Sequence, residues 1–98
     1  MTREEILAAA KKCVCGDRDQ QYGTPENSFG VIAEFWEAYL KATNPGAEIN
    51  IDGADVAALM ALFKIARIAT GTQKADSWID AAGYIACGAE IAEGSVNG

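Results

Sequence analysis

Histidine is absent from this chain of 98 residues, and cysteine, another residue type that often carries chemistry, is scarce. Without histidine, the chain has no Ser-His-Asp or Cys-His hydrolase site and no imidazole general base. Three cysteines occur, Cys13, Cys15 and Cys87, with no CxxC pair. A zinc site would need all three thiolates and a carboxylate, so we expect reduced cysteines that fill apolar space. Catalysis must use carboxylates, Lys, Tyr or a metal held by oxygen ligands, which favours Mg²⁺ or Mn²⁺.

Positive charge is also scarce, because 8 Lys and Arg residues stand against 14 Asp and Glu residues and leave a net charge of −6. That charge repels a duplex nucleic acid and no basic run offsets it, so we expect no nucleic-acid partner. No run of about 18 apolar residues is present that could span a membrane. The first residues, MTREEILAAAKK, lack a signal-peptide pattern. We therefore expect a cytoplasmic protein with no membrane partner.

Hydrophobic residues make up 50% of the chain, and many of them are alanine. A chain of this length is one domain, and folding buries only about 60–65% of its unfolded surface. Small side chains each bury little area, so a single copy makes a thin core. We therefore predict one helical domain over residues 1–98, with a frayed tail at about 94–98, that assembles as a homo-oligomer.

Start and stop signals predict an all-α, four-helix bundle-like fold. Thr2 with Glu5 and Asp52 with Asp55 match capping boxes, and Thr24 before Pro25 is a typical helix start. The predicted helices cover about Arg3–Val14, Pro25 to the Asn44–Gly46 stop, Asp52 to Thr70, and Asp76–Ala92.

Apolar residues recur at three- and four-residue steps in the second predicted helix, which indicates an amphipathic helix. On this pattern Trp36 and Tyr39 belong to the core, and we expect the same of Trp78. Gly83 and Gly88 lie inside the last predicted helix, where each costs about 1 kcal/mol relative to alanine. Their presence predicts close approach of another helix, or a ligand against the backbone.

Four charged residues form the main candidate site. Asp76 and Asp80 are one turn apart and share a helix face, as do Lys64 and Arg67 on the preceding helix. If the two helices fold back on each other, the carboxylates face the cations. Asp76 and Asp80 are then candidate metal ligands and catalytic residues, and Lys64 and Arg67 would stabilise charge on a phosphate.

A structural alternative remains open for these four residues. Asp76 can cap the last helix and Asp80 can lie in its first turns, where the helix dipole favours anions. Lys64–Asp80 and Arg67–Asp76 would then be interhelical ion pairs, each adding about 0–1 kcal/mol if exposed.

Other residues are candidates on weaker grounds. Glu34 and Glu37 form an ExxE step on one helix face, and they could complete a metal site or lie in solvent. Arg18 and Tyr22 lie beside a glycine and a helix start, a setting that can hold an anion. With Tyr84, they are our candidate substrate-binding residues.

Four segments resemble a family of small all-α proteins of unknown function that phages and prophages encode. They are RDQQYGTPENSF, IAEFWEAYL, DVAALMALFKIAR and DSWIDAAGYIACGAE, which occur in this order between about Arg18 and Glu90. The resemblance implies a phage origin and an all-α fold, and it implies no reaction.

A more distant likeness is to the all-α nucleotide pyrophosphohydrolases of the MazG type. These enzymes bind Mg²⁺ through an ExxE…ExxD pattern on helices and cleave nucleoside triphosphates to monophosphates. Glu34 and Glu37 match the first half of that pattern, whereas Asp76 and Asp80 are spaced DxxxD instead of ExxD. The likeness implies a nucleotide ligand and a magnesium-dependent hydrolase. The alternative is a non-catalytic helical oligomer, a phage accessory or interaction module in which the charged cluster is purely structural.

Overall fold

The computed structural model describes residues 1–17, 25–71 and 75–97, and of residues 17, 25–27 and 95–97 it describes the backbone alone. Over this part of the chain the fold is all helical and contains no strand, as predicted. The elements in chain order are α1 (Arg3–Lys12), the π-helix η1 (Cys13–Asp17), α3 (Pro25–Thr43), α4 (Gly53–Thr70) and α5 (Ala75–Asn97).

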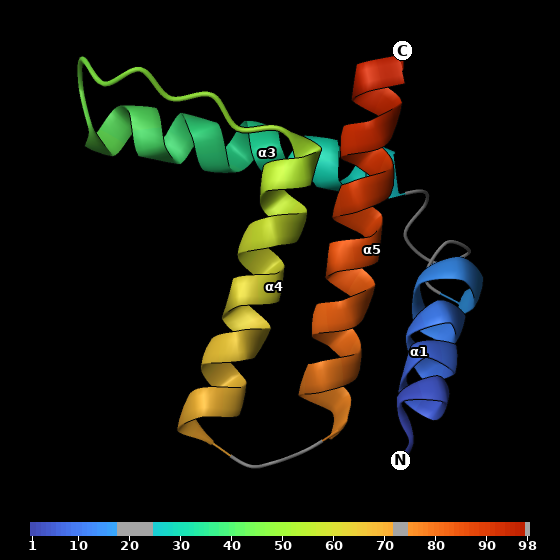
Figure 1. The fold of residues 1–98 in the computed structure, drawn as a ribbon. Coiled ribbons are helices and arrows are strands. Elements are labelled where there is room, and N and C mark those ends of the chain that lie inside the picture. The colour runs from blue at the N-terminus through green and yellow to red at the C-terminus, as the bar shows by residue number, and fades with distance from the viewer. Residues whose placement is uncertain (18–24, 72–74, 98) are drawn as a thin grey trace.

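An antiparallel hairpin of α4 and α5 forms the centre of the molecule (Figure 1). Helix α1 lies along α5, on the side away from α4, and α3 crosses the end of the hairpin where α4 begins and α5 ends. The fold is therefore one helical domain in which α3 lies across the other helices, instead of alongside them as in a regular bundle. The chain reverses after α3 through Gly46, whose φ of 86° favours glycine.

Local signals placed most helix ends correctly. Thr2 and Glu5 form a reciprocal capping box at the start of α1, and Asp52 and Asp55 form another at the start of α4. The backbone N–H of Thr2 donates to Glu5 at 2.8 Å, and this hydrogen bond lowers the pKa of the Glu5 carboxyl. Helix α3 ends at Thr43, directly before the predicted stop.

Two helix ends differ from the prediction. The first helix was expected to end at about Val14, but the chain continues past Gly16 through the wider π turn of η1 to Asp17. That turn brings Val14 against Gly83 of α5. At the other end of the chain, α5 continues beyond Ala92 to Asn97, because Gly94 keeps a negative φ and does not adopt the left-handed conformation of a helix cap.

The core lies where α3, α4 and α5 meet, and its central side chain is Val56, which is 0% exposed. The buried residues packed around it are Phe29, Ala33, Ala57, Ala61, Tyr84 and Cys87. A Cβ added at Gly88 would lie 2.9 Å from the Cβ of Ala57, and one at Gly83 would lie 2.9 Å from Val14 Cγ1. The predicted close helix approach at both glycines is confirmed.

Several expected core residues lie at the surface. Tyr39 is 68% exposed and Trp78 is 54% exposed, so the prediction that they are core residues was wrong, whereas Trp36 packs against the core. The cause at Tyr39 is that the second half of α3 extends beyond α4, and no other helix of the described residues lies beneath it (Figure 1). Cys87 is buried as expected, but Cys13 and Cys15 are exposed free thiols.

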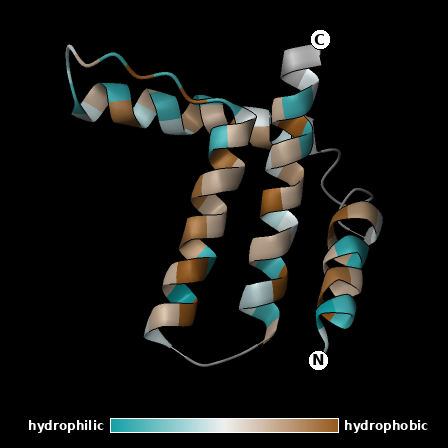
Figure 2. Cartoon of the chain, viewed as in Figure 1, coloured by the Kyte–Doolittle hydropathy of each residue, from teal (hydrophilic) through white to brown (hydrophobic). Residues whose placement is uncertain are grey.

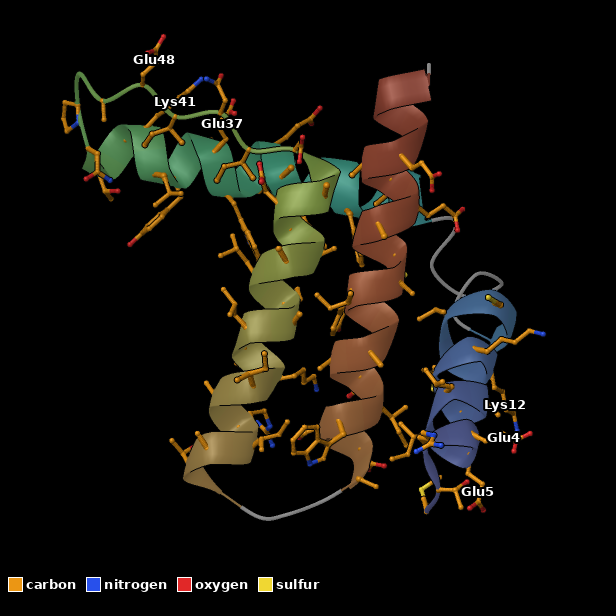
Figure 3. The ribbon with its side chains drawn as sticks, viewed as in Figure 1. Glu4, Glu5, Lys12, Glu37, Lys41 and Glu48 are labelled. Carbon is orange, nitrogen blue, oxygen red and sulfur yellow. The ribbon has the colours of Figure 1, made fainter. Side chains whose placement is uncertain are left out.

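Glu37 connects α3 to the start of α4. One carboxylate oxygen accepts a hydrogen bond from the backbone N–H of Ile51 at 2.7 Å, and the other lies 3.2 Å from the Lys41 ammonium. Figure 3 shows Glu37 and Lys41 on α3, beside the segment that leads back toward α4. The hydrogen bond from Ile51, with a smaller effect of Lys41, lowers the pKa of the Glu37 carboxyl.

Because the pKa of Glu37 is lower in the folded chain than in the unfolded chain, its carboxylate stabilises the fold above the unfolded pKa of about 4.3. This stabilisation is lost as the pH falls from there through the lower pKa of the folded state. We expect Glu37→Gln to melt at a lower temperature than the natural chain at pH 7. The difference should shrink as the pH falls below about 4.3. Glu34→Gln is the matched control, because Glu34 is exposed and one turn away on the same helix. Equal effects of the two variants on thermal unfolding curves across this pH range would contradict the assignment.

Candidate functional site

The main candidate site lies at the end of the hairpin where α4 ends and α5 begins, which we call its turn end. The last turns of α4 carry Lys64 and Arg67, and the first turns of α5 carry Asp76 and Asp80. Because the two helices are antiparallel and packed against each other, these four side chains line one pocket of about 490 Å³. Its other described lining residues are Thr70, Gly71 and Ser77.

An ion pair joins the two helices inside this pocket. Lys64 Nζ lies 2.9 Å from an oxygen of Asp80, and the two side chains are 20% and 36% exposed. This is the pair expected from helical spacing. Its partial exposure limits its contribution to about 1 kcal/mol or less.

The second expected ion pair does not form. Among the described residues, Arg67 makes no ion pair with Asp76, and both residues are exposed. The Arg67 guanidinium lies 5.9 Å from the centre of the Phe63 ring, as does the Lys64 ammonium. Both cations are thus within cation–π range of one aromatic side chain. Asp76 is the second residue of α5, so it lies in the first turn and is not the N-cap.

The two glutamates predicted as metal ligands lie elsewhere. Glu34 and Glu37 are on α3, which crosses the hairpin at the end opposite to the turn (Figures 1 and 3). Glu34 is exposed, and Glu37 is engaged by Ile51 and Lys41. Within one copy, the described part of the chain gathers no group of three or more Asp, Glu or Cys residues that could hold a metal ion. The structure therefore brings together Asp76 and Asp80 and does not bring Glu34 and Glu37 to them.

Tyr84, one of the candidate substrate-binding residues, does not line this pocket. Tyr84 is 9% exposed, and its ring lies 6.1 Å from that of Phe29 in the core. It lines a separate recess of about 10 Å³, which is enough for about one water molecule at most. Arg18 and Tyr22 lie outside the described residues.

Thr70 and Ser77 are residues that sequence reasoning missed. Their hydroxyl groups are neutral hydrogen-bonding groups beside the four charges. Each is separated from a predicted site residue by three positions, Thr70 from Arg67 and Ser77 from Asp80, and so shares its helix face. That spacing could have identified them once the hairpin was assumed.

The charged groups that line the pocket decide which ligands it can bind. Two carboxylates and two cations cancel in formal charge, so the described lining is neutral as a whole. Mg²⁺ is usually held by one or two carboxylates together with waters and phosphate oxygens of a ligand. The described residues fit that arrangement, and they do not form a site in which protein side chains alone surround a metal.

The chain matches proteins of phage origin. A family model described as a domain of unknown function, DUF6378, matches residues 5–92. The Gene 55 protein of Mycobacterium phage D29 is 39% identical over 95 residues, which cover 97% of this chain and 58% of that protein. The Gene 55 protein of Mycobacterium phage L5 is 37% identical over 79 residues, which cover 81% of this chain and 47% of that protein.

This chain therefore spans about half the length of these relatives. No solved structure matches it. None of the helices in the described residues is long and apolar enough to cross a bilayer. The expected resemblance to a phage-encoded family is confirmed, and the chain belongs to the DUF6378 family, whose function is unknown.

Proposed function

We propose that the pocket between α4 and α5 binds a magnesium-complexed polyphosphate, such as that of a nucleoside triphosphate, in the cytoplasm of the host cell. The observation that carries the proposal is that Lys64, Arg67, Asp76 and Asp80 surround one pocket of about 490 Å³. That volume lies within the range of about 300–1,000 Å³ typical of small-molecule sites. Solvent reaches the pocket because Arg67, Thr70 and Asp76 are exposed.

Charge explains why the metal is part of the proposal. The described lining is formally neutral, so it has no net attraction for a polyphosphate. A bound Mg²⁺ adds two positive charges and turns the pocket into an anion site. Asp76 and Asp80 would hold the metal, and Lys64 and Arg67 would bind phosphate oxygens. Ser77 would donate a hydrogen bond to the same oxygens, whereas the Thr70 hydroxyl donates to the Ala66 carbonyl at 2.8 Å.

Hydrolysis is the finer form of this proposal, and it rests on the distant likeness to MazG-type pyrophosphohydrolases. A metal of this kind lowers the pKa of a bound water and polarises a phosphoryl oxygen. Addition of that water across the bond between the first two phosphates would give a nucleoside monophosphate and pyrophosphate. A pocket carboxylate would take the proton of the water, while Lys64 and Arg67 stabilise the charge on the phosphates.

Binding can be measured by thermal unfolding and titration calorimetry with Mg²⁺ alone, a nucleoside triphosphate alone, and both together. We expect stabilisation with both together, by about 2.7 kcal/mol at a ligand concentration of 100 times Kd. Arg67→Gln should weaken binding at least tenfold, or about 1.4 kcal/mol. Arg3→Gln is the matched control, because Arg3 is exposed on α1 and is outside the pocket.

Each outcome of this experiment distinguishes one form of the proposal from another. Asp80→Asn should abolish the dependence on Mg²⁺ while leaving a folded chain. If the natural chain releases pyrophosphate from the nucleotide and Asp80→Asn does not, the pocket hydrolyses its ligand as well as binding it. No stabilisation by magnesium with any member of a nucleoside triphosphate panel would exclude the proposal.

A second candidate is the non-catalytic interaction module, in which the Lys64–Asp80 pair only joins the two helices. The specific observation in its favour is the exposed apolar surface of α4, where Leu62 is 59% exposed and Phe63 and Ile65 are each 51% exposed. Under this function Asp80→Asn lowers the melting temperature by a few degrees, for about 1 kcal/mol lost, and metals have no effect.

A further inference from the structure

Helix α4 is apolar on two opposite sides. One side, with Val56, Ala57 and Ala61, is buried in the core of its own chain. The opposite side, which we call the outer face of α4, is exposed to solvent. Its members are Ala58, Leu59, Leu62, Phe63, Ile65, Ala66 and Ala69. Figure 2 shows that hydrophobic residues occur along most of this helix. A helix that is hydrophobic all round is normally buried all round, so this face lacks a covering layer.

The outer face carries no charge. Between Val56 and Ala69 the charged residues of α4 are Lys64 and Arg67. Both line the pocket beside α5, at the edge of the outer face next to Phe63. The net charge of the chain is −6, so two copies repel each other over most of their surfaces. The outer face is a surface where two acidic chains can meet without bringing carboxylates together.

The surface area of one copy is larger than that of a compact protein of its size. It exposes 6917 Å², whereas a monomer of 10.3 kDa exposes about 5,400 Å². The surplus is therefore about 1,500 Å² for each chain. The radius of gyration is 14.7 Å, against about 13 Å for a compact chain of about 100 residues. A standard interface removes about 800 Å² from each partner and an obligate one removes more, so the surplus is the amount that stable pairing removes.

From these three observations we infer that the outer face of α4 packs against the same face of a second copy of this chain. Such an interface is isologous, because a two-fold axis brings each residue of the face to the same surface of the partner. The small residues Ala58, Ala66 and Ala69 let the two helix backbones approach closely. Leu59, Leu62, Phe63 and Ile65 then bury the apolar area that one copy leaves exposed.

The inferred interface also reaches the pocket. Phe63 belongs to the outer face, and its ring lies 5.9 Å from both the Lys64 ammonium and the Arg67 guanidinium. A second copy that covers Phe63 would restrict the side chains of these two cations at the edge of the pocket. The interface itself does not depend on any ligand, so the test below is independent of polyphosphate binding.

The molecular mass in solution tests the inference, by sedimentation velocity and by light scattering after gel filtration, from low to high micromolar concentration. We expect the natural chain to show about twice the 10.3 kDa mass of one copy. Leu62→Glu should show the mass of one copy, because it would bury one unpaired carboxylate from each copy in the apolar interface. Leu7→Glu is the matched control, because Leu7 is 62% exposed on α1, compared with 59% for Leu62, and is not on the outer face.

The milder variant Leu62→Ala keeps the test decisive if Leu62→Glu does not fold, as circular dichroism would show. Leu62→Ala should shift the association midpoint at least tenfold toward higher concentration. A single-copy mass for the natural chain at every concentration would overturn the inference. If Leu7→Glu dissociates the dimer, the interface lies elsewhere and the inference is overturned. The same holds if Leu62→Glu and Leu62→Ala leave association unchanged.

Discussion

Replacing Phe29 with alanine is expected to lower the free energy of unfolding by about 3–5 kcal/mol, which is the cost of deleting a buried phenyl ring. Phe29 is 4% exposed and its ring lies 6.1 Å from that of Tyr84 on α5. A Cβ added at Gly53, the first residue of α4, would lie 3.4 Å from the Cβ of Phe29. The ring therefore lies where α3 crosses both helices of the hairpin, and its loss leaves a cavity at that crossing.

The size of this loss matters because a domain of about 100 residues is stable by only about 5–15 kcal/mol. Each kcal/mol lost lowers the melting temperature by about 4–8 °C in a domain of 60–100 residues. Thermal or urea unfolding followed by circular dichroism should therefore show Phe29→Ala unfolding at least about 12 °C below the natural chain.

Phe35→Ala is the control, because Phe35 has the same side chain on the same helix but is 72% exposed. At concentrations where single copies predominate, its effect should stay within about 0.5 kcal/mol, as for other surface substitutions. Similar losses in the two variants would mean that α3 does not lie on the hairpin as described.

The helix ends could be predicted from sequence because their causes are local. The capping boxes at Thr2 and Asp52 and the stop at Asn44 each depend on residues a few positions apart. The predicted ends at about Val14 and Ala92 were less accurate, because the glycines that follow them, Gly16 and Gly94, permit a helix end and do not require one. At Gly16 the helix widens into η1 instead, and that outcome depends on contact with α5, which is distant in sequence.

The candidate site could be predicted in part. Lys64 and Asp80 meet because two antiparallel helices separated by few residues in the sequence place these two positions opposite each other. Arg67 is three residues further on and therefore about 60° around α4 from Lys64, so it need not face the same partner. Glu34 and Glu37 lie on α3, and whether that helix runs along the hairpin or across it is a tertiary property that periodicity does not contain.

The sequence could predict which side of α3 is apolar, but not how far along the helix that side is buried. The apolar stripe of α3 includes Phe29, Ala33 and Trp36, which face the core. It also included Tyr39, which is 68% exposed because no part of α4 lies beneath that end of the helix. Amphipathic spacing indicates which side of a helix is apolar, while the extent of the neighbouring helix decides how much of that side is covered.

Replacing Gly88 with alanine is expected to lower the free energy of unfolding, although alanine is the better helix former. The new methyl group would lie 2.9 Å from the Cβ of Ala57, well inside the 3.5–4.0 Å of a normal carbon contact. Ala57 is 0% exposed and has no side-chain torsion that could move its methyl away. The backbones of α4 and α5 must therefore separate, which disturbs the packing around Val56.

The two effects can be weighed against each other. Overpacking a core costs about 1–3 kcal/mol, while replacing a helical glycine by alanine gains up to about 1 kcal/mol. We therefore expect Gly88→Ala to lose about 1–2 kcal/mol net in urea or thermal unfolding.

Gly30→Ala isolates the gain, because Gly30 lies inside α3 and a Cβ there would have nothing within 4 Å. This control should therefore be more stable than the natural chain by about 0.5–1 kcal/mol. Opposite signs for the two variants would establish that Gly88 serves close contact between α4 and α5. If both variants are more stable than the natural chain, α4 and α5 lie farther apart at Gly88 than the 2.9 Å between the added Cβ and Ala57 implies. The pocket between the same two helices would then lose its geometric basis.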